Sequence, residues 1–132
     1  MNVPGGERHS IDEVLAAARA RLDRIEPETL ERECAAGALI VDIRPVEQRA
    51  QDGGLPGAIV VDRNVLEWRL DPGCEHHIAE MVGYDMRIVI VCNERDSSSL
   101  AAAQLRDLGR HRATDLVGGF QAWRRLSASE KR

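Results

Sequence analysis

Aromatic residues, lysine and long apolar stretches are scarce in this sequence. Its 132 residues include one Phe, one Tyr and two Trp, so a core has to be built from aliphatic side chains. No apolar run approaches the ~20 residues that span a bilayer, and residues 1–10 lack the apolar stretch of a secretory signal. We therefore expect a cytoplasmic protein with no membrane partner.

The cationic residues are almost all arginine, since Lys131 is the only lysine among 18 Lys and Arg residues. The arginines are scattered and the net charge is -4, which gives no electrostatic reason to expect a nucleic-acid partner. The three cysteines, Cys34, Cys74 and Cys92, are odd in number and unevenly spaced. In a reducing compartment we expect such cysteines to remain thiols.

The length of the chain predicts one domain. A Pro-Gly-Gly stretch near the N-terminus marks a disordered lead-in, and Ser10 with Glu13 has the spacing of a capping box at the start of a helix. The chain accordingly divides into a lead-in, a helical extension, a folded domain and a tail, at residues 1–9, 10–24, 25–127 and 128–132.

Short apolar runs alternate with helical patterns through the folded domain. Four runs are predicted as strands, at residues 38–43, 58–61, 87–91 and 113–117. Three segments have helical spacing, at residues 27–36, 98–108 and 120–126. The first three runs are apolar apart from Asp42 and Arg87, which suggests strands buried on both faces. The alternation predicts an α/β fold, a single three-layer domain with a central parallel sheet and helices on both faces.

In open α/β sheets, ligands bind beyond the carboxyl ends of the strands. Polar clusters follow three predicted strands, at residues 42–44, 62–64 and 92–99, and only the last contains an obvious nucleophile, Cys92. The helix predicted after Ser97 directs its free N–H groups and partial positive charge at this loop, which stabilises a thiolate and holds an oxyanion. The alternative interpretation is that Cys92 is a small buried residue that ends a strand.

Four motifs, taken in order along the chain, resemble those of the rhodanese-like family of sulfurtransferases. Residues 41–44 (VDIR) are similar to the D-x-R strand end of that family, and residues 55–58 (LPGA) to its I-P-G-A turn. Residues 89–92 (VIVC) resemble its active-site strand and nucleophile. Residues 116–123 (LVGGFQAW) resemble its closing G-G-x-x-x-W signature. The resemblance runs from residue 25 to residue 126 and implies a single rhodanese-like domain.

The resemblance also implies a sulfurtransferase mechanism. The thiolate of Cys92 takes a sulfane sulfur from a small anionic donor such as thiosulfate, and the persulfide passes it to a thiol, to cyanide or to a protein acceptor. Neither a metal nor an organic cofactor is implied, and we expect a monomer or a homodimer. The implied substrate cradle consists of the residues that follow the nucleophile: Asn93, Glu94, Arg95, Asp96, Ser97 and Ser98. Asp42 and Arg44 resemble the pair that braces the site.

Three features depart from the family pattern. The glycine that usually stands three residues after the cysteine is Arg95 here, and a side chain resists the curl that glycine allows. Its neighbours Glu94 and Asp96 oppose a thiolate by charge. The histidine that often precedes the I-P-G-A turn is Gly54. Two functions therefore stay open: a sulfurtransferase, and a catalytically weak or inactive rhodanese-like module for regulation or protein binding.

A phosphatase and a metal site are weaker alternatives. The related phosphatases need an arginine six residues after the cysteine to clamp phosphate, and that position is Ser98. Cys74, His76 and His77 form a short Cys/His tract, but no fourth ligand completes a tetrahedral zinc site. We expect a loop or helix-cap role for this tract.

The remaining conspicuous residues have structural interpretations. The serines at 97–99 have no identifiable base nearby, so helix capping explains them best. Trp68, among aliphatic residues, predicts core packing. Arg63 and Arg69 flank that segment; we expect solvated surface arginines, with a place at the mouth of the pocket as the alternative.

Overall fold

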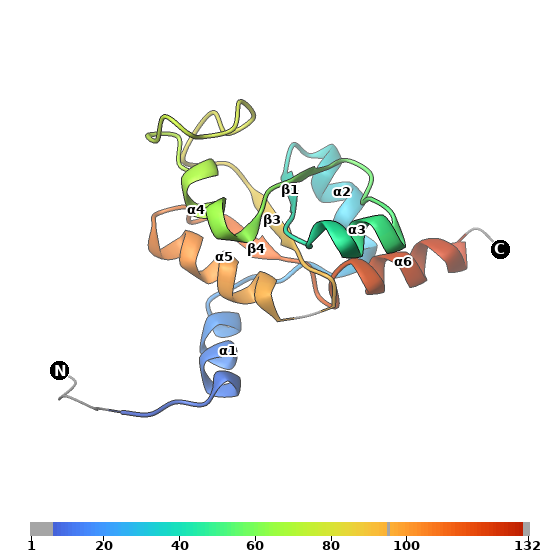
Figure 1. The fold of residues 1–132 in the computed structure, drawn as a ribbon, viewed down its shortest axis with the longest axis horizontal. Coiled ribbons are helices and arrows are strands. Elements are labelled where there is room, and N and C mark those ends of the chain that lie inside the picture. The colour runs from blue at the N-terminus through green and yellow to red at the C-terminus, as the bar shows by residue number, and fades with distance from the viewer. Residues whose placement is uncertain (1–6, 95, 131–132) are drawn as a thin grey trace.

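The computed structural model describes residues 7–94 and 96–130 (Figure 1). A parallel sheet of four strands, in the order β2-β1-β3-β4, lies at the centre. The strands are β1 (Leu39–Asp42), β2 (Ala58–Val60), β3 (Ile88–Val91) and β4 (Ala113–Asp115). This arrangement confirms the predicted α/β fold with a parallel sheet. Residues 1–6 of the predicted lead-in lie outside the described residues, and residues 7–9 are in neither helix nor strand.

Helices connect the strands and precede the first of them. The α-helices are α1 (Ile11–Ala20), α2 (Leu30–Ala35), α3 (Val46–Asp52), α4 (Leu66–Arg69), α5 (Ser97–Asp107) and α6 (Gly119–Glu130). Short 3-10 turns, η1 (Pro27–Thr29) and η2 (Arg63–Val65), lead into α2 and α4. Helices α3 and α4 were not predicted: α3 buries no residue and so has no apolar stripe, and α4 is a single turn. Among the described residues no helix has the length and apolarity to cross a bilayer.

The capping box predicted at the start of α1 is confirmed. The Ser10 hydroxyl accepts from the backbone N–H of Glu13 at 3.0 Å, and the Glu13 carboxylate accepts from the backbone N–H of Ser10 at 3.0 Å. The hydrogen bond from the Ser10 backbone lowers the pKa of Glu13, since it favours the carboxylate. The helical extension thus begins at Ser10, as its sequence predicts.

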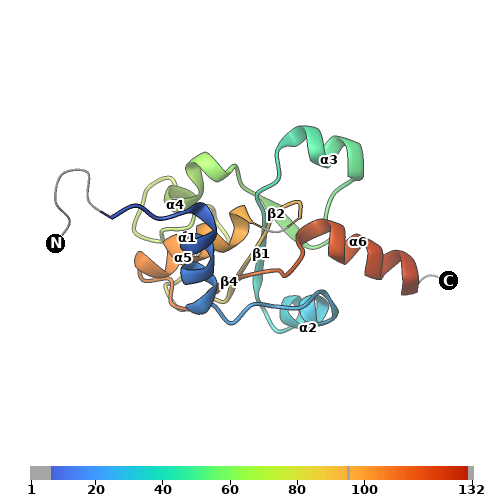
Figure 2. The same cartoon turned by 90° about the horizontal axis from the view of Figure 1, so that it is seen from below.

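Two apolar clusters cover the two faces of the sheet, which gives the molecule three layers (Figure 2). One cluster joins the sheet to α4 and α5, and the other joins it to α2 and α6. Side chains along β3 alternate between them: Ile88 and Ile90 belong to the first cluster, Val89 and Val91 to the second. The next residue, Cys92, returns to the first. The alternation therefore directs the sulfur of Cys92 toward the α5 side of the sheet.

Three expectations about the fold are wrong. β2 is an edge strand and Val60 is 48% exposed, so this strand is not buried on both faces. Trp68 is 56% exposed, because the single turn of α4 turns Leu66 and Leu70 inward and Trp68 outward. Helix α6 continues to Glu130, past its predicted end at residue 126, so the expected tail begins inside the helix.

Candidate active site

Cys92 is the first residue after β3, and its side chain is 5% exposed. It lies at the wall of a cavity of about 470 Å³. The loop side of the cavity is lined by Cys92, Asn93, Glu94, Asp96 and Ser97. The other lining residues follow the end of β1 and include Arg44, Pro45 and Gln48. The structure thus brings most of the predicted site residues to one cavity, while the predicted cradle residue Arg95 lies outside the described residues.

The start of α6 holds the loop that carries Cys92. The backbone N–H of Phe120 donates to the carbonyl of Cys92 at 2.8 Å, and that of Gln121 donates to the carbonyl of Asn93 at 3.0 Å. The Gln121 amide also donates to the Asn93 side chain at 3.0 Å. Gly119 has φ +62°, and a Cβ there would lie 2.5 Å from the carbonyl oxygen of Cys92. Glycine at this position therefore lets α6 reach the loop.

Asp42 and Arg44 form a buried ion pair at the end of β1, with 2.8 Å between Arg44 Nη2 and Asp42 Oδ2. Arg44 Nη2 also donates to the carbonyl of Gly53 at 2.9 Å, and its guanidinium lies 3.7 Å from the ring centre of Phe120. These contacts hold the Arg44 side chain in place where it lines the cavity. Its Nη1 is buried and has no hydrogen-bond partner among the described residues.

Behind the sulfur, two serines of α5 meet an aspartate of β4. Cys92 Sγ lies 3.3 Å from the hydroxyl of Ser98, and that hydroxyl donates to Asp115 Oδ2 at 2.8 Å. The hydroxyl of Ser99 donates to the same oxygen at 2.7 Å. The residue at the N-cap is Asp96, without a side-chain capping bond. For Ser98 and Ser99 the predicted capping role is therefore wrong, because both hydroxyls turn inward to a buried carboxylate.

Sequence reasoning missed Asp115 and the arginine that pairs with it. Asp115 is fully buried, and Arg24 bonds both of its oxygens, at 2.9 and 3.1 Å. The signal available in the sequence was an acidic residue inside an apolar strand, which has to find a partner. No local pattern in the sequence indicated which residue this partner is, because Arg24 is 91 positions away along the chain.

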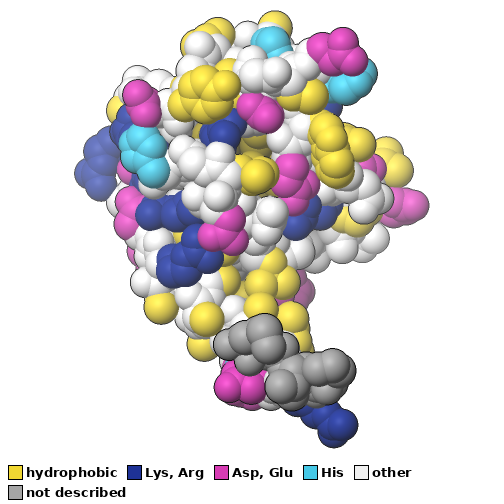
Figure 3. Space-filling model, turned by 90° about the vertical axis from the view of Figure 1, so that its left-hand side faces the viewer, with side chains coloured by type: hydrophobic (Ala, Val, Ile, Leu, Met, Phe, Trp, Pro, Cys, Tyr) yellow, Lys and Arg dark blue, Asp and Glu magenta, His cyan; other side chains and the backbone are white. Residues whose placement is uncertain are grey.

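The second predicted polar cluster, residues 62–64, lines a neighbouring cavity of about 410 Å³ that shares Ile43, Arg44 and Pro45 with the first. Arg63 pairs there with Glu67 at 3.0 Å, while Arg69 donates to the carbonyl of His76. The Cys74 tract lies in a loop, and the described residues contain no group of three or more His, Cys, Asp or Glu side chains arranged to hold a metal ion. On the face drawn in Figure 3, basic and acidic side chains are interspersed.

Comparison with known families and proteins gives a consistent result. The family model of the rhodanese-like domain matches residues 26–126. Thiosulfate sulfurtransferase GlpE of Pseudomonas savastanoi pv. phaseolicola is 31% identical over 104 residues, 76% of this chain and 86% of that protein. The GlpE protein of Ectopseudomonas mendocina is 30% identical over 107 residues, 81% of this chain and 89% of that protein.

Solved structures share the fold. The human single-domain sulfurtransferase TSTD1 superposes with a TM-score of 0.66 at 25% identity, over 77% of this chain and 95% of that one. A protein of unknown function from Rhodopseudomonas palustris, described as a possible tyrosine phosphatase, superposes with a TM-score of 0.81 at 27% identity. That likeness covers 96% of this chain and 97% of the other, so it extends beyond residues 26–126.

Proposed function

The chain belongs to the rhodanese-like family, and from this membership we propose that it is a sulfurtransferase that carries a sulfane sulfur on Cys92 as a persulfide. The observation that carries the proposal is the place of Cys92, directly after the central strand β3 and at the wall of a cavity. Relatives named thiosulfate sulfurtransferase support thiosulfate as a donor. Ser98, in place of the arginine that a phosphatase needs six residues after the cysteine, favours sulfur over phosphate chemistry.

In the first step, the ionised sulfur of Cys92 attacks the outer sulfur of thiosulfate. A new S–S bond forms, the S–S bond of the donor breaks, and sulfite leaves with the electron pair. The first N–H groups of α5, at Ser97 and Ser98, lack intrahelical partners and favour an anion at this end of the helix. The Ser98 hydroxyl is a further hydrogen-bonding group for the sulfur.

In the second step, a thiol or cyanide attacks the outer sulfur of the persulfide and releases the thiolate of Cys92. The acceptor has to enter the cavity between the loop and Arg44, because Cys92 is 5% exposed. This chemistry uses the sulfur itself as carrier and calls for no metal or organic cofactor. We place the reaction in the cytoplasm, where the other two thiols, Cys34 and Cys74, stay reduced.

Charges around the cavity make thiosulfate a slow donor. Glu94 and Asp96 are exposed carboxylates on the loop side, and they repel a dianion. Arg44 also lines the cavity, but its charge is balanced by Asp42 at 2.8 Å. A donor with less negative charge at the attacked sulfur is therefore expected to react faster.

The test is the intact mass of the native protein after incubation with thiosulfate. We expect a gain of one sulfur atom that cyanide removes, and we expect no gain in Cys92→Ser. Cys34→Ser serves as the matched control, since Cys34 is an exposed thiol outside the cavity, and this variant should gain the sulfur as the native protein does.

Two outcomes would contradict the proposal. A sulfur gain that survives in Cys92→Ser would assign the reaction to another residue. A native protein that gains no sulfur from thiosulfate, or from a less charged persulfide donor, would favour the non-catalytic module for regulation or protein binding.

A further inference from the structure

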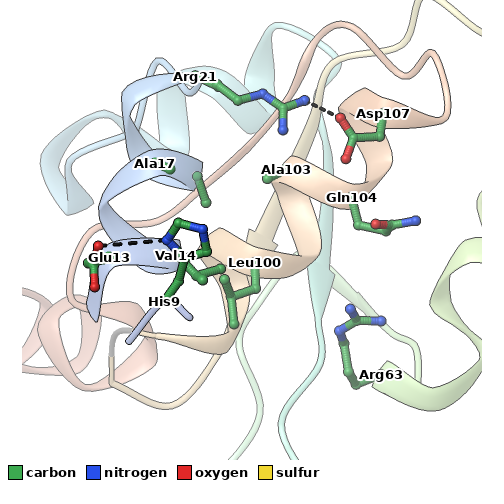
Figure 4. A pocket seen from close by; sticks show the side chains of 11 residues that line it. His9, Glu13, Val14, Ala17, Arg21, Arg63, Leu100, Ala103, Gln104 and Asp107 are labelled. Carbon is green, nitrogen blue, oxygen red and sulfur yellow. Dashed lines mark hydrogen bonds and ion pairs between the residues drawn. The ribbon is translucent and has the colours of Figure 1, made fainter. Parts of the chain in front are cut away.

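The segment before residue 26 reaches the interior of the matched domain. Helix α1 lies along α5, where Val14 is beside Leu100 and Arg21 pairs with Asp107 (Figure 4). After α1 the chain runs alongside β4: the N–H of Ile25 donates to the carbonyl of Asp115 at 2.9 Å. This backbone contact places the neighbouring Arg24 over the Asp115 side chain.

The carboxylate of Asp115 is fully buried and accepts four hydrogen bonds. Arg24 supplies two of them, at 2.9 Å to Oδ1 and 3.1 Å to Oδ2. Ser98 and Ser99 supply the other two, both to Oδ2. The Ser99 hydroxyl also accepts from Arg19 Nε of α1 at 3.0 Å. A buried charge needs such partners, and Arg24 is the cation that bonds the carboxylate directly.

The Ser98 hydroxyl has one proton to share between Asp115 and Cys92. In the resting protein that proton goes to Asp115 at 2.8 Å, so the oxygen accepts from the Cys92 thiol at 3.3 Å. After the thiol loses its proton to water in the cavity, the sulfur can only accept. Stabilising it requires the Ser98 proton to turn from the carboxylate to the sulfur.

Arg24 lowers the free-energy cost of this reorientation of the Ser98 hydroxyl. Asp115 keeps the two bonds from Arg24 and the bond from Ser99 when Ser98 turns away. Without Arg24, an unbalanced negative charge would hold the Ser98 proton and repel the thiolate directly. Both effects disfavour the ionised sulfur of Cys92, so they add.

The other charged groups near the sulfur lie on different elements. Arg44, which is paired with Asp42, lines the cavity just after β1, and Glu94 and Asp96 lie on the exposed loop. From α1, Arg19 donates to the Ser99 hydroxyl at 3.0 Å and pairs with Asp96 at 3.4 Å. Within the described residues, the Arg24–Asp115 pair is therefore the ion pair that is joined to the sulfur through Ser98, while Arg19 reaches the same carboxylate only through Ser99.

We propose that Arg24 is a positioning residue for Cys92: its pairing with Asp115 leaves the Ser98 hydroxyl able to turn its proton to the ionised sulfur. The role rests on the proposed function only in that the thiolate is the reacting form. A residue that precedes the part of the chain matched by the family model thereby influences the reactive cysteine.

The test measures the rate of Cys92 alkylation against pH in the absence of any sulfur donor, with peptide mapping to follow Cys92 alone. Arg24→Met should move the midpoint of the rate profile up by about one pH unit, and leave the alkaline plateau unchanged. Asp115→Asn should move the midpoint down, because it leaves the positive charge of Arg24 behind the sulfur. The double variant Arg24→Met/Asp115→Asn should return it close to the native value, since both charges are gone.

Arg21→Met is the matched control, because it removes another arginine of the same segment and breaks the pair with Asp107 but touches neither Asp115 nor Ser98. Its profile should match that of the native protein. If one single variant fails to fold, the other single variant should still shift the midpoint in its predicted direction, and the double variant should still lie close to the native midpoint. A native midpoint in Arg24→Met, or a double variant that stays as far from native as Arg24→Met, would overturn the role of Arg24.

The alkylation profiles, taken together with the mass assay for persulfide formation, separate this inference from the proposed function. A native protein that forms no persulfide, yet shows the expected order of midpoints, would contradict sulfur transfer and leave the positioning role intact. A protein that forms the persulfide but shows unchanged midpoints in all variants would support sulfur transfer and contradict the positioning role.

Discussion

At Gly119, the absence of a side chain decides how closely α6 approaches the reactive loop. A Cβ at this position would lie 2.5 Å from the carbonyl oxygen of Cys92 and 2.9 Å from backbone atoms of Asn93. The N–H of Phe120 could then no longer reach that carbonyl at 2.8 Å. The second glycine of the closing signature is therefore a steric requirement of the loop around Cys92.

We predict that Gly119→Ala destabilises the protein by roughly 1–3 kcal/mol and slows sulfur uptake, because the loop has to move away from α6. Urea denaturation and the mass assay with thiosulfate measure the two effects. Gly37→Ala is the matched control: Gly37 has φ +100°, and a Cβ there would meet nothing within 4 Å, so this variant carries the backbone strain alone. Equal losses of stability in the two variants would show that the close approach at Gly119 costs nothing.

At the scale of elements, the loop between β3 and α5 sets the charge that a donor meets. Its carboxylates at Glu94 and Asp96 are exposed, and Asp96 Oδ1 lies 3.4 Å from Arg19 Nη2 of α1. An exposed pair of this kind contributes little, so Asp96 still repels an anion that enters the cavity. At an effective dielectric of about 20, a carboxylate about 4 Å away opposes an anion by roughly 4 kcal/mol before screening.

We predict that Arg95→Gly combined with Asp96→Asn raises the rate of persulfide formation with thiosulfate by about threefold to tenfold, or roughly 0.7–1.4 kcal/mol in the barrier. The glycine restores the residue that the family has at this position, and the asparagine removes one repelling charge. The rate of mass gain in single-turnover reactions measures the effect, with Asp96→Asn alone as the control for charge. A double variant no faster than the native protein would mean that the loop does not limit the reaction.

At the scale of the whole molecule, a surface network joins segments that are far apart in the sequence. Asp23, between α1 and η1, pairs with Arg87 at 3.0 Å and with Arg106 of α5 at 2.8 Å. Partial burial by itself raises the pKa of Asp23, but the hydrogen bond and charge of Arg87, with the charge of Arg106, hold it below its ordinary value. Folding therefore favours the charged form of Asp23.

The sign of the pH dependence follows from this lowered pKa. The stability contributed by Asp23 is present above the unfolded-state pKa of about 3.9 and is lost as the pH falls through the lower folded-state value. Asp23→Asn should therefore be less stable than the native protein near pH 7, by about 0.2–1 kcal/mol per exposed pair lost, and the two should converge under acid conditions. Urea denaturation at several pH values measures the difference, and a gap that persists in acid would contradict the assignment to this carboxylate.

Much of the fold was predictable because its signals are local. The apolar run at β3 and the capping box at Ser10 follow from residues a few positions apart, and the structure has both. The exposure of Val60 and Trp68 was not predictable in this way. Local patterns do not indicate which tertiary neighbours an element has. Those neighbours decide whether a strand lies at the edge of a sheet and which way a single helical turn faces.

The same division applies to the candidate site. Local patterns in the chain were enough to predict that Cys92 follows an apolar strand, that Asp42 and Arg44 stand at the end of another, and that Gly118 and Gly119 stand where the last helix begins. The contact of Ser98 with the sulfur and the pairing of Arg24 with Asp115 behind it became visible in the folded chain alone. The physical reason is that a buried charge must be paired, while its partner can come from any part of the chain that the fold brings near.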